Sequence, residues 1–438
     1  MDERARDGGA LNPRSPRPGG SGPFRAFHSL RTSSGFRLLW ISNVFFFGGL
    51  WTQTLILSWM AFEITHSTFL VALLTTFRFA PLLLGPFSGV LSDRIDRRGM
   101  LIGTNMIALV ASAVCAVLAL LGEAPYPVLL IAGLALGLAQ SPSQPARAAL
   151  VFQLVGRENL SNANALNVLA MNGSQMIGPA LGGALIGLIG APAALAVSVA
   201  WYAVALVALW RLRTPRVDPA HSGGSAWRML IEGFVTIGRH RVAVSVLLIT
   251  LCANVLIWPI YQSFMPVFAD DVLHLDAAGL GAMLMCAGLG GVIGSLVIAG
   301  LGDFRGKGAL FVGGTALWGV LWVLFALSDS IPVSLLLLCG IGLVSAPFGV
   351  LQTTLLLMAT PPRVQGRALG VQELAIGMTP IAAAVLGAIA QNAGVAITTL
   401  FSGCLLIVCV LGIAAAAPQV LRYHGFDPVE PIDPIEPI

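Results

Sequence analysis

The stretch Gly89-Val-Leu-Ser-Asp93-Arg94-Ile-Asp96-Arg97-Arg98 places five charged residues within ten positions of a chain that is 56% hydrophobic and only 10% charged. Long uncharged tracts precede and follow it. A helix needs about 20 mostly apolar residues to span a membrane, and soluble domains contain roughly 25% charged residues. The stretch is therefore predicted to be a short polar loop between two membrane-spanning helices.

Twelve segments of the chain are apolar and long enough to span a membrane, which predicts an all-α membrane protein with twelve transmembrane helices. Several contain Gly or Pro, which helices tolerate better in lipid than in water. Only Gly190-Ala-Pro192 separates the fifth segment from the sixth, so a count that merges these two stays open. The segments are residues 38–62, 68–91, 100–121, 126–146, 163–188, 193–210, 243–268, 277–301, 309–328, 332–357, 368–391 and 395–417.

Basic residues are distributed unevenly around these segments. With the N-terminus inside, 23 of the 24 Lys and Arg residues fall on the cytoplasmic side, and Arg78 is the remaining one, within the second segment. The opposite loops contain no Lys or Arg, and their charged residues are all acidic: Glu123, Asp270, Asp271, Asp276 and Asp329. Because cytoplasmic loops are enriched in Lys and Arg, both termini are predicted to be cytoplasmic, in a multi-pass protein of the inner membrane.

The segments divide into two groups of six around a hydrophilic stretch. Within that stretch Trp227, Leu230, Ile231 and Phe234 recur at helical spacing, which predicts an amphipathic helix on the inner leaflet. The predicted organisation is a disordered cytoplasmic tail (1–35), an N-terminal six-helix half (36–210), a linker (211–242), a C-terminal six-helix half (243–417) and a disordered Pro-rich acidic tail (418–438).

The second half repeats the charged loop in weaker form. Between the eighth and ninth segments stands Asp303-Phe-Arg-Gly306-Lys307, again an acid at a helix end followed four residues later by a cation. An acid in this position can pair with a local Arg or stabilise the positive N-terminus of a neighbouring helix. Since such contacts can form in one conformation and break in another, we interpret both loops as conformational latches.

The first loop resembles the GxLaDRxGRR signature of the major facilitator superfamily. The matching residues are Gly89, Asp93, Arg94, Arg97 and Arg98. Asp96 stands where the signature has glycine. The resemblance covers all twelve segments and implies two pseudo-symmetric six-helix halves that move a small molecule by alternating access.

The fifth segment contains Gly178-Pro179-Ala-Leu-Gly182-Gly183, which is similar to the GPxxGG stretch of exporters in that superfamily, although Ser174 replaces the glycine expected one turn earlier. Glycines spaced by four let helix backbones approach closely, and the eighth segment offers Gly290 and Gly294 at that spacing. The resemblance places the fifth and eighth segments against each other across the two halves. Ordinary packing glycines are the alternative interpretation.

Longer stretches resemble the drug and siderophore exporter branch, which includes enterobactin and macrolide exporters. Among them are Ser141-Pro-Ser-Gln-Pro-Ala-Arg147 and Met265-Pro-Val-Phe-Ala269. The chain lacks the RxxxG arginine that many proton-coupled members carry in the fourth segment, so the usual coupling arrangement of the superfamily is not matched.

Ionisable groups inside a membrane are costly and are by default functional candidates. At 1.5 Å per residue, Arg78 lies roughly 15 Å into the second segment and Glu373 roughly 8 Å into the eleventh. The resemblance makes these segments neighbours, so both side chains are predicted to face one cavity. Glu373 is the candidate for proton uptake and release, and a locally satisfied carboxylate is the alternative. Glu63, at the outer end of the first segment, is either another coupling candidate or a solvated interfacial carboxylate.

Two polar clusters are candidates for lining a substrate cavity. Asn164, Asn167 and Gln175 lie near one face of the fifth segment. Asn254, Trp258, Tyr261 and Gln262 follow the i, i+4, i+7, i+8 spacing of one helix face in the seventh segment. Pro259 is predicted to break that helix and free backbone carbonyls there. Packing between helices is the alternative for both clusters.

The leading functional prediction is secondary export of small amphipathic compounds, of drug or siderophore type, driven by proton antiport. Uptake or facilitated diffusion of a small metabolite is the alternative, and a non-transporting receptor or an intramembrane enzyme is a remote one. The chain has no Walker-type GxxxxGK[ST] motif and no CxxC spacing among its six cysteines. We therefore expect no nucleotide, nucleic acid, metal or cofactor, and a monomer whose partners are its substrate and the lipid bilayer.

Overall fold

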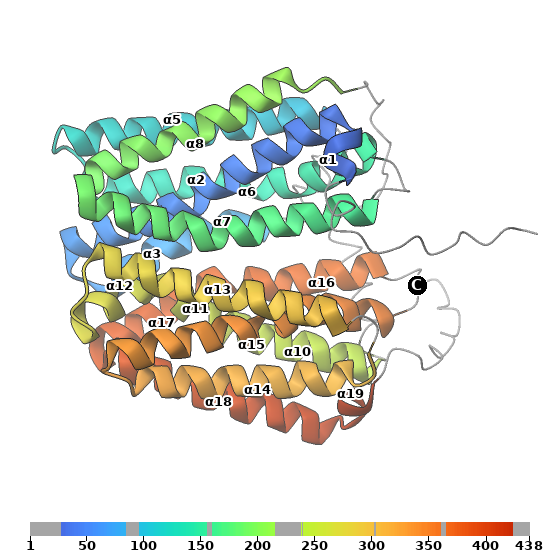
Figure 1. Ribbon diagram of the computed structural model, residues 1–438. Helices are drawn as coiled ribbons and strands as arrows, with labels where there is room; N and C mark the ends of the chain where they lie inside the picture. Colours follow the sequence, from blue (N-terminus) through green and yellow to red (C-terminus); the bar gives the residue numbers. More distant parts are fainter. Residues whose placement is uncertain are drawn as a thin grey trace, which may run out of the picture.

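A computed structural model of the protein describes residues 28–84, 96–155, 160–214, 238, 240–301, 304–360 and 365–423. Within these ranges every regular element is helical. Ten of the helices are long and apolar enough to cross a membrane, by length and composition. The protein is thus an all-helical, multi-pass membrane protein, with its helices side by side in two groups (Figure 1).

The first group contains the helices before the linker. They are α1 (His28–Thr32), α2 (Ser34–Thr65), α3 (Thr68–Phe79) with its 3-10 continuation η2 (Ala80–Leu84), α5 (Arg97–Leu120), α6 (Tyr126–Val155), α7 (Leu160–Ile189) and α8 (Ala191–Arg211). The span Thr68–Leu83 is a shorter apolar helix than the ten. α7 is 30 residues long but more polar, because it carries asparagines and a glutamine.

The second group contains the helices after the linker. They are α10 (Arg241–Leu256), α11 (Trp258–Ser263), α12 (Met265–Val267), the π-helical turn η3 (Phe268–Val272), α13 (Ala277–Leu301), α14 (Lys307–Ala326), α15 (Ile331–Met358), α16 (Gln365–Gly377), α17 (Thr379–Ala393), α18 (Val395–Ala416) and α19 (Gln419–Arg422). Each of the twelve predicted segments overlaps one of these helices or a consecutive run of them.

Side-chain caps and prolines set the ends of several helices. Ser33 accepts a hydrogen bond from the backbone N–H of Phe36 at the start of α2, and a serine or aspartate in this position satisfies an otherwise unpaired helical N–H. Pro259 has no N–H to continue the helical ladder, and α10 ends just before it, so that α11 restarts at Trp258. α16 and α17 meet in the same way before Pro380.

The predicted boundaries differ from the structure at three places. α6 continues to Val155, nine residues beyond the predicted segment, which stops before Arg147; the helix carries on because this arginine is buried against Asn43 of α2. α1 and α19 lie inside the two segments predicted to be disordered tails, and the Tyr423 hydroxyl after α19 donates to the carbonyl oxygen of Met358 at 2.7 Å. The predicted amphipathic linker helix falls outside the described residues.

Two helix pairs make the most extensive contacts between the groups. α7 packs against α13, and α3 packs against α17, as the resemblance implied for the fifth and eighth segments and for the second and eleventh. Within each group the remaining helices pack on one another. Large side chains on the outside of the bundle are apolar, for example Leu188 and Leu336, which are 80% and 73% exposed. An apolar exterior of this kind is suited to lipid.

The glycines of α13 divide between two partners, and one expectation about them was wrong. A Cβ atom on Gly290 would overlap the carbonyl oxygen of Cys339 on α15, and one on Gly294 would overlap that of Leu343. These glycines therefore pack α13 against α15 within the second group, not against α7. The sequence gives their spacing, but the rotation of α13 about its axis is set by its neighbours.

Other glycines make the contact between α7 and α13. A Cβ atom on Gly183 would lie 2.5 Å from the carbonyl oxygen of Ala277 and 2.9 Å from Cα of Gly281. One on Gly288 would lie 2.8 Å from Cα of Met176. Because real Cβ atoms do not approach so closely, only glycine fits here, and the two groups meet with their backbones in contact.

Candidate substrate cavity

A cavity of about 260 Å³ lies in the middle of the bundle, between the two groups. Its walls come from α2, α3, η2, α6 and α7 on one side and from α10, α11, α15, α16 and α17 on the other. Polar side chains lining it are Gln140, Gln144, Gln175, Asn254, Gln262, Gln352 and Thr379. Aromatic side chains lining it are Phe47, Trp51, Phe79 and Trp258. The volume of this central cavity is close to the lower end of the size range of small-molecule sites.

The helix breaks position several of its polar groups. Asn254 precedes the break at Pro259, where its Nδ2 donates to the carbonyl oxygen of Thr250 at 2.8 Å. Thr379 follows the break between α16 and α17, and its hydroxyl lies 3.4 Å from Oδ1 of Asn254. Two broken helices thus bring an amide and a hydroxyl together on the wall of the central cavity.

The predicted cavity residues do not all line the same cavity. Gln175, Asn254, Trp258 and Gln262 line the central cavity. Tyr261 lines an adjoining cavity of about 490 Å³, which also touches Gln175 and Trp258 and extends between α13 and α15.

The two remaining candidates on α7, Asn164 and Asn167, are not among the residues that line the central cavity. Asn167 accepts a hydrogen bond at 2.9 Å from Nδ2 of Asn43 on α2. It therefore contacts a neighbouring helix, which corresponds to the alternative of packing between helices. The side chain of Asn164 lies outside the described part of the protein.

Four cavity residues escaped the sequence analysis, namely Gln140, Gln144, Gln352 and Thr379. The three glutamines could have been recognised from the sequence, because glutamines inside apolar segments are unusual. Gln140 and Gln144 are moreover four residues apart, which is the spacing of one helix face, so this pair could have been found in the same way as the other two clusters.

The cavity is closed at one end of the bundle. We call this the short-loop end, because it carries the short connections at 66–67, 190 and 394. There Oε1 of Gln391 on α17 accepts hydrogen bonds from the hydroxyl of Ser67 at 2.8 Å and from the N–H of Phe69 at 3.1 Å. About two turns deeper, the hydroxyl of Thr76 donates to the carbonyl oxygen of Pro380 at 2.9 Å.

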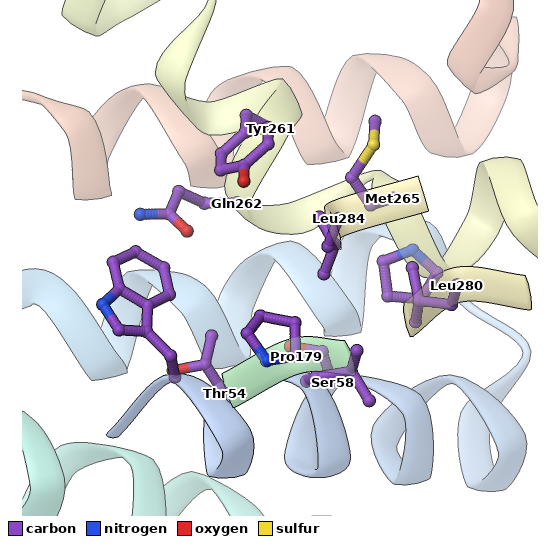
Figure 2. Close-up of a pocket in the computed structure, with 11 residues that line it drawn as sticks. Thr54, Ser58, Pro179, Tyr261, Gln262, Met265, Leu280 and Leu284 are labelled. Atoms are coloured by element: carbon purple, nitrogen blue, oxygen red, sulfur yellow. The ribbon is translucent and has the colours of Figure 1, made fainter. Parts of the chain in front are cut away.

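Between the closed end and the central cavity, side chains from both groups interlock around a smaller pocket (Figure 2). Thr54 and Ser58 reach it from α2, and Pro179 of the exporter-like motif reaches it from α7. The opposite wall is formed by Tyr261, Gln262, Met265, Leu280 and Leu284. Any path from the central cavity to the short-loop end must separate these residues.

The glycines of that motif have two different roles. A Cβ atom on Gly178 would lie 2.9 Å from Cβ of Trp51, and one on Gly182 would lie 3.1 Å from the carbonyl oxygen of Thr52. These two glycines therefore hold α7 against α2 within the first group. Gly183 alone of the motif faces the second group.

Arg78 does not face the central cavity. Its side chain is 3% exposed and lines a small cavity with Thr54, Ser58 and Thr75, between α2, α3 and α6. None of its three guanidinium nitrogens has a hydrogen-bond partner among the described residues. The expectation that Arg78 and Glu373 share one cavity was therefore wrong, because α3 turns Arg78 toward its own group.

The structure reveals a second buried arginine, Arg147, that the sequence analysis had assigned to a cytoplasmic loop. It lies within α6 and is 3% exposed. Its Nη1 donates to Oδ1 of Asn43 and lies 3.5 Å from the hydroxyl of Ser42. Since Asn43 in turn donates to Asn167, a chain of hydrogen bonds joins α6, α2 and α7. The fourth helix thus does carry an arginine, though without the RxxxG spacing.

Glu373 lies at the rim of the central cavity. Its side chain is exposed, and it precedes Ile376 and Gly377, which line the cavity, by three and four residues. Residues at this spacing share a helix face. Glu373 therefore lies one turn from the cavity, on the side away from the short-loop end. Its neighbour Gln372 points elsewhere and donates to the hydroxyl of Thr353 at 2.8 Å.

Glu63 lies at the short-loop end, where it is exposed and lines a surface pocket with Glu123. It is remote from the central cavity, as the interfacial alternative held. Among the described residues no group of three or more His, Cys, Asp and Glu side chains could hold a metal ion.

The described part of the first latch loop forms helix caps. The carboxylate of Asp96 accepts a hydrogen bond from the N–H of Gly99 at 2.8 Å, at the start of α5. Arg98 donates to the carbonyl oxygens of Leu209 and Trp210 at 3.2 and 2.9 Å, at the end of α8. Both contacts are within the first group, and both complement the helix dipole.

Of the other latch residues, Arg97 and Lys307 lie in the described part of the chain. Arg97 begins α5, and Lys307 begins α14 with its side chain buried. Gly89, Asp93, Arg94 and Asp303 lie outside the described residues. Their role as a latch stays a prediction.

A carboxylate at the short-loop end gives a pH prediction. Partial burial and the neighbouring Asp270 raise the pKa of Asp271, while His66 and His274 act in the opposite direction. A carboxyl group with a raised pKa contributes stability below its ordinary pKa of about 3.9, and this is lost as the pH rises through the raised value. We expect Asp271→Asn to raise the melting temperature at pH 7.5 by at most about 2 °C. Melting curves of both proteins should converge near pH 4, and a difference that persists there would contradict this origin.

Two helical groups that meet around a central cavity, closed at one end, define the class of protein: a membrane transporter. A family model described as "Transmembrane secretion effector" matches residues 25–424. The chain therefore belongs to the transmembrane secretion effector family of the major facilitator superfamily.

Relatives and solved structures agree with this assignment. The chain is 24% identical to the multidrug efflux pump Tap of Mycolicibacterium fortuitum, over 76% of this chain and 83% of the pump. It is 27% identical to the enterobactin exporter EntS of Citrobacter koseri, over 83% of this chain and 87% of the exporter. These relatives and the family are transporters, not enzymes.

Among solved structures, the nucleoside transporter NupG superposes with a TM-score of 0.70 at 15% identity, covering 87% of this chain and 100% of NupG. A POT family transporter in complex with 5-aminolevulinic acid superposes with a TM-score of 0.72 at 13% identity, covering 89% of this chain and 97% of that one. At such identities the likeness establishes the fold.

Proposed function

We propose that this protein exports small amphipathic molecules across the bacterial inner membrane in exchange for protons, by alternating access of its two helical groups. The observation that carries the proposal is the central cavity, whose polar and aromatic walls come from both groups and which is closed at the short-loop end. A rocking motion that separates α3 from α17 and α7 from α13 would open that end. Efflux-pump relatives support export as the direction.

The proposal includes twelve spanning helices with both termini in the cytoplasm. Ten helices are long and apolar enough to span the membrane, and the proposal adds α7 and the shorter helix Thr68–Leu83 as spanning helices. The short connections at 66–67, 190 and 394 then lie outside, and the chain ends lie inside. The positive-inside rule supports this orientation, because the short-loop end carries acidic residues in its loops. The structure would then correspond to a cavity closed toward the outside.

We assign proton coupling to Glu373. It is the ionisable side chain at the rim of the central cavity in the described part of the chain, one turn from the lining residues Ile376 and Gly377. A carboxylate there would be solvated while the rim is open and enclosed when the groups rock to close it. Enclosure favours the neutral, protonated form of a carboxyl group, which links proton binding to the conformational change.

Transport in proteoliposomes tests the proposal directly. With an acid interior, wild-type protein is expected to accumulate enterobactin or the neutral dye Nile red against a gradient. Glu373→Gln should reduce this accumulation to that of protein-free liposomes, because the side chain no longer exchanges a proton. Glu63→Gln, which changes an exposed carboxylate at the short-loop end, is the matched control and should retain accumulation.

Each other result has a defined meaning. Accumulation that survives in Glu373→Gln would remove this residue from the coupling step. Equilibration that ignores the pH gradient would instead support facilitated diffusion, and accumulation with the opposite gradient would support uptake.

A further inference from the structure

The polar groups on the wall of the central cavity are uncharged. Six side-chain amides and one hydroxyl line it, and no Asp, Glu, Lys or Arg does so among the described residues. Oε1 of Gln140 and Oε1 of Gln352 are buried there without a hydrogen-bond partner in the described structure. Since leaving a buried polar group unpaired is costly, these amides are suited to hydrogen bonds with a bound molecule.

Two buried guanidinium groups lie behind the wall on the side of the first group. Arg78 lies 5.1 Å from the ring centroid of Phe79, and Arg147 lies 5.8 Å from that of Phe47. Both rings line the central cavity, whereas neither arginine does. Each aromatic ring on this side of the wall therefore has an arginine nearby, except Trp51.

No described carboxylate balances these two cations. Among the residues that the structure describes, the guanidinium nitrogens of Arg78 have no partner, and Arg147 bonds through Nη1 to Asn43 and Ser42 only. Arginine keeps its charge inside proteins. The side of the cavity formed by α2, α3 and α6 therefore carries a positive electrostatic potential.

That potential acts on a bound molecule. A group stacked against Phe47 or Phe79 from the cavity lies within about 10 Å of a guanidinium. At an effective dielectric constant near 20, each arginine then lowers the binding affinity of a positively charged group roughly tenfold relative to a neutral one. Cation–π attraction to Trp51 and Trp258 acts the other way, but it needs contact within about 6 Å of a ring centre. The two arginines oppose a cation throughout this side of the cavity.

We propose that the central cavity binds amphipathic molecules that carry hydrogen-bonding groups and no positive charge, and that Arg78 and Arg147 set this selectivity from behind the wall. The inference rests on the proposed function in taking this cavity as the substrate site. It names a substrate class and excludes lipophilic cations.

Tetraphenylborate and tetraphenylphosphonium test the charge preference, because they share four phenyl groups and differ in the sign of their charge. Binding of each ion to the full-length protein in detergent would be followed by quenching of tryptophan fluorescence, since Trp51 and Trp258 line the cavity. The two ions also partition differently into micelles. The informative quantity is therefore the ratio of their dissociation constants, compared between variants.

We expect Arg78→Gln and Arg147→Gln each to reduce the preference for the borate ion roughly tenfold relative to wild type. Arg98→Gln should leave the ratio unchanged, because Arg98 caps α8 away from the cavity. Arg78→Lys and Arg147→Lys keep the charge and should keep the ratio. Gln352→Glu adds a negative charge to the wall without touching either arginine, and should also shift the ratio toward the phosphonium ion if an arginine variant fails to fold.

Wild-type ratios in Arg78→Gln, Arg147→Gln and Gln352→Glu would overturn the inference, as would the absence of saturable binding of tetraphenylborate. The measurement uses no gradient. A protein that shows the charge preference but does not accumulate substrate against a pH gradient would therefore retain this selectivity and lose the proposed antiport.

Discussion

Replacing Gly183 with leucine is expected to abolish transport while leaving a folded protein. A side chain on Gly183 would collide with Ala277 and Gly281 of α13, which belongs to the opposite helical group. The collision exists only while α7 and α13 are in contact at the short-loop end. The variant should therefore populate the arrangement in which that end is open, because a substitution shifts a conformational equilibrium toward the state that it does not disfavour.

Cysteine labelling would detect this shift. In a background without the six native cysteines, Ser58→Cys places a thiol in the pocket that closes the short-loop end. A membrane-impermeant maleimide should label it slowly in otherwise unchanged protein and rapidly when Gly183→Leu is added. Wild-type rates of transport and labelling in the Gly183→Leu protein would contradict the role of this contact.

Gly342→Leu is the matched control and should behave differently. A Cβ atom at Gly342 would overlap the carbonyl oxygen of Ala287, but α13 and α15 belong to the same helical group. No rocking of the two groups relieves that collision, so we expect loss of folded protein in size-exclusion chromatography. Overpacking of this kind belongs with the most destabilising substitutions. Normal folding of Gly342→Leu would show that α13 and α15 can separate.

The second large effect is expected at Asn43. Asn43→Leu removes the amide oxygen that accepts from Arg147 and leaves this buried cation with Ser42 as its remaining oxygen contact. Breaking a buried, charged hydrogen bond from one side costs about 3 kcal/mol. We expect a corresponding loss of stability in reversible SDS unfolding, and recovery of most of it in the double variant Asn43→Leu/Arg147→Met, which removes the buried charge.

Asn105→Leu provides the control for this experiment. Asn105 is equally buried, but its Nδ2 donates only to the carbonyl oxygen of Leu101 in its own helix. Its removal strands no charge and should cost much less than Asn43→Leu. Equal costs for the two asparagines, or a double variant no more stable than Asn43→Leu alone, would contradict the coupling between Asn43 and Arg147.

Local features of the sequence were sufficient for the helical fold and for part of the cavity. Apolar runs predicted the helices, because lipid requires every backbone N–H and C=O to be bonded within the chain. Asn254, Trp258 and Gln262 were identified by helical spacing, and the break near Pro259 followed from the missing N–H of proline. These properties depend on neighbours in the sequence, so no tertiary information was needed.

Tertiary packing decided the rest. Periodicity shows which residues share a helix face, but not which neighbour that face meets. Gly290 and Gly294 thus face α15, Gly281 and Gly288 face α7, and Arg78 points away from the central cavity.

Arg147 shows the same limit at a helix end. By sequence it follows two prolines and belongs to a loop, yet α6 continues past it to Val155, and Asn43 and Phe46 of α2 surround its guanidinium. The sequence by itself determined which apolar segments form the long helices. The rotation of each helix, the burial of both arginines and the closure of one end come from contacts between residues distant in the chain, which local patterns do not encode.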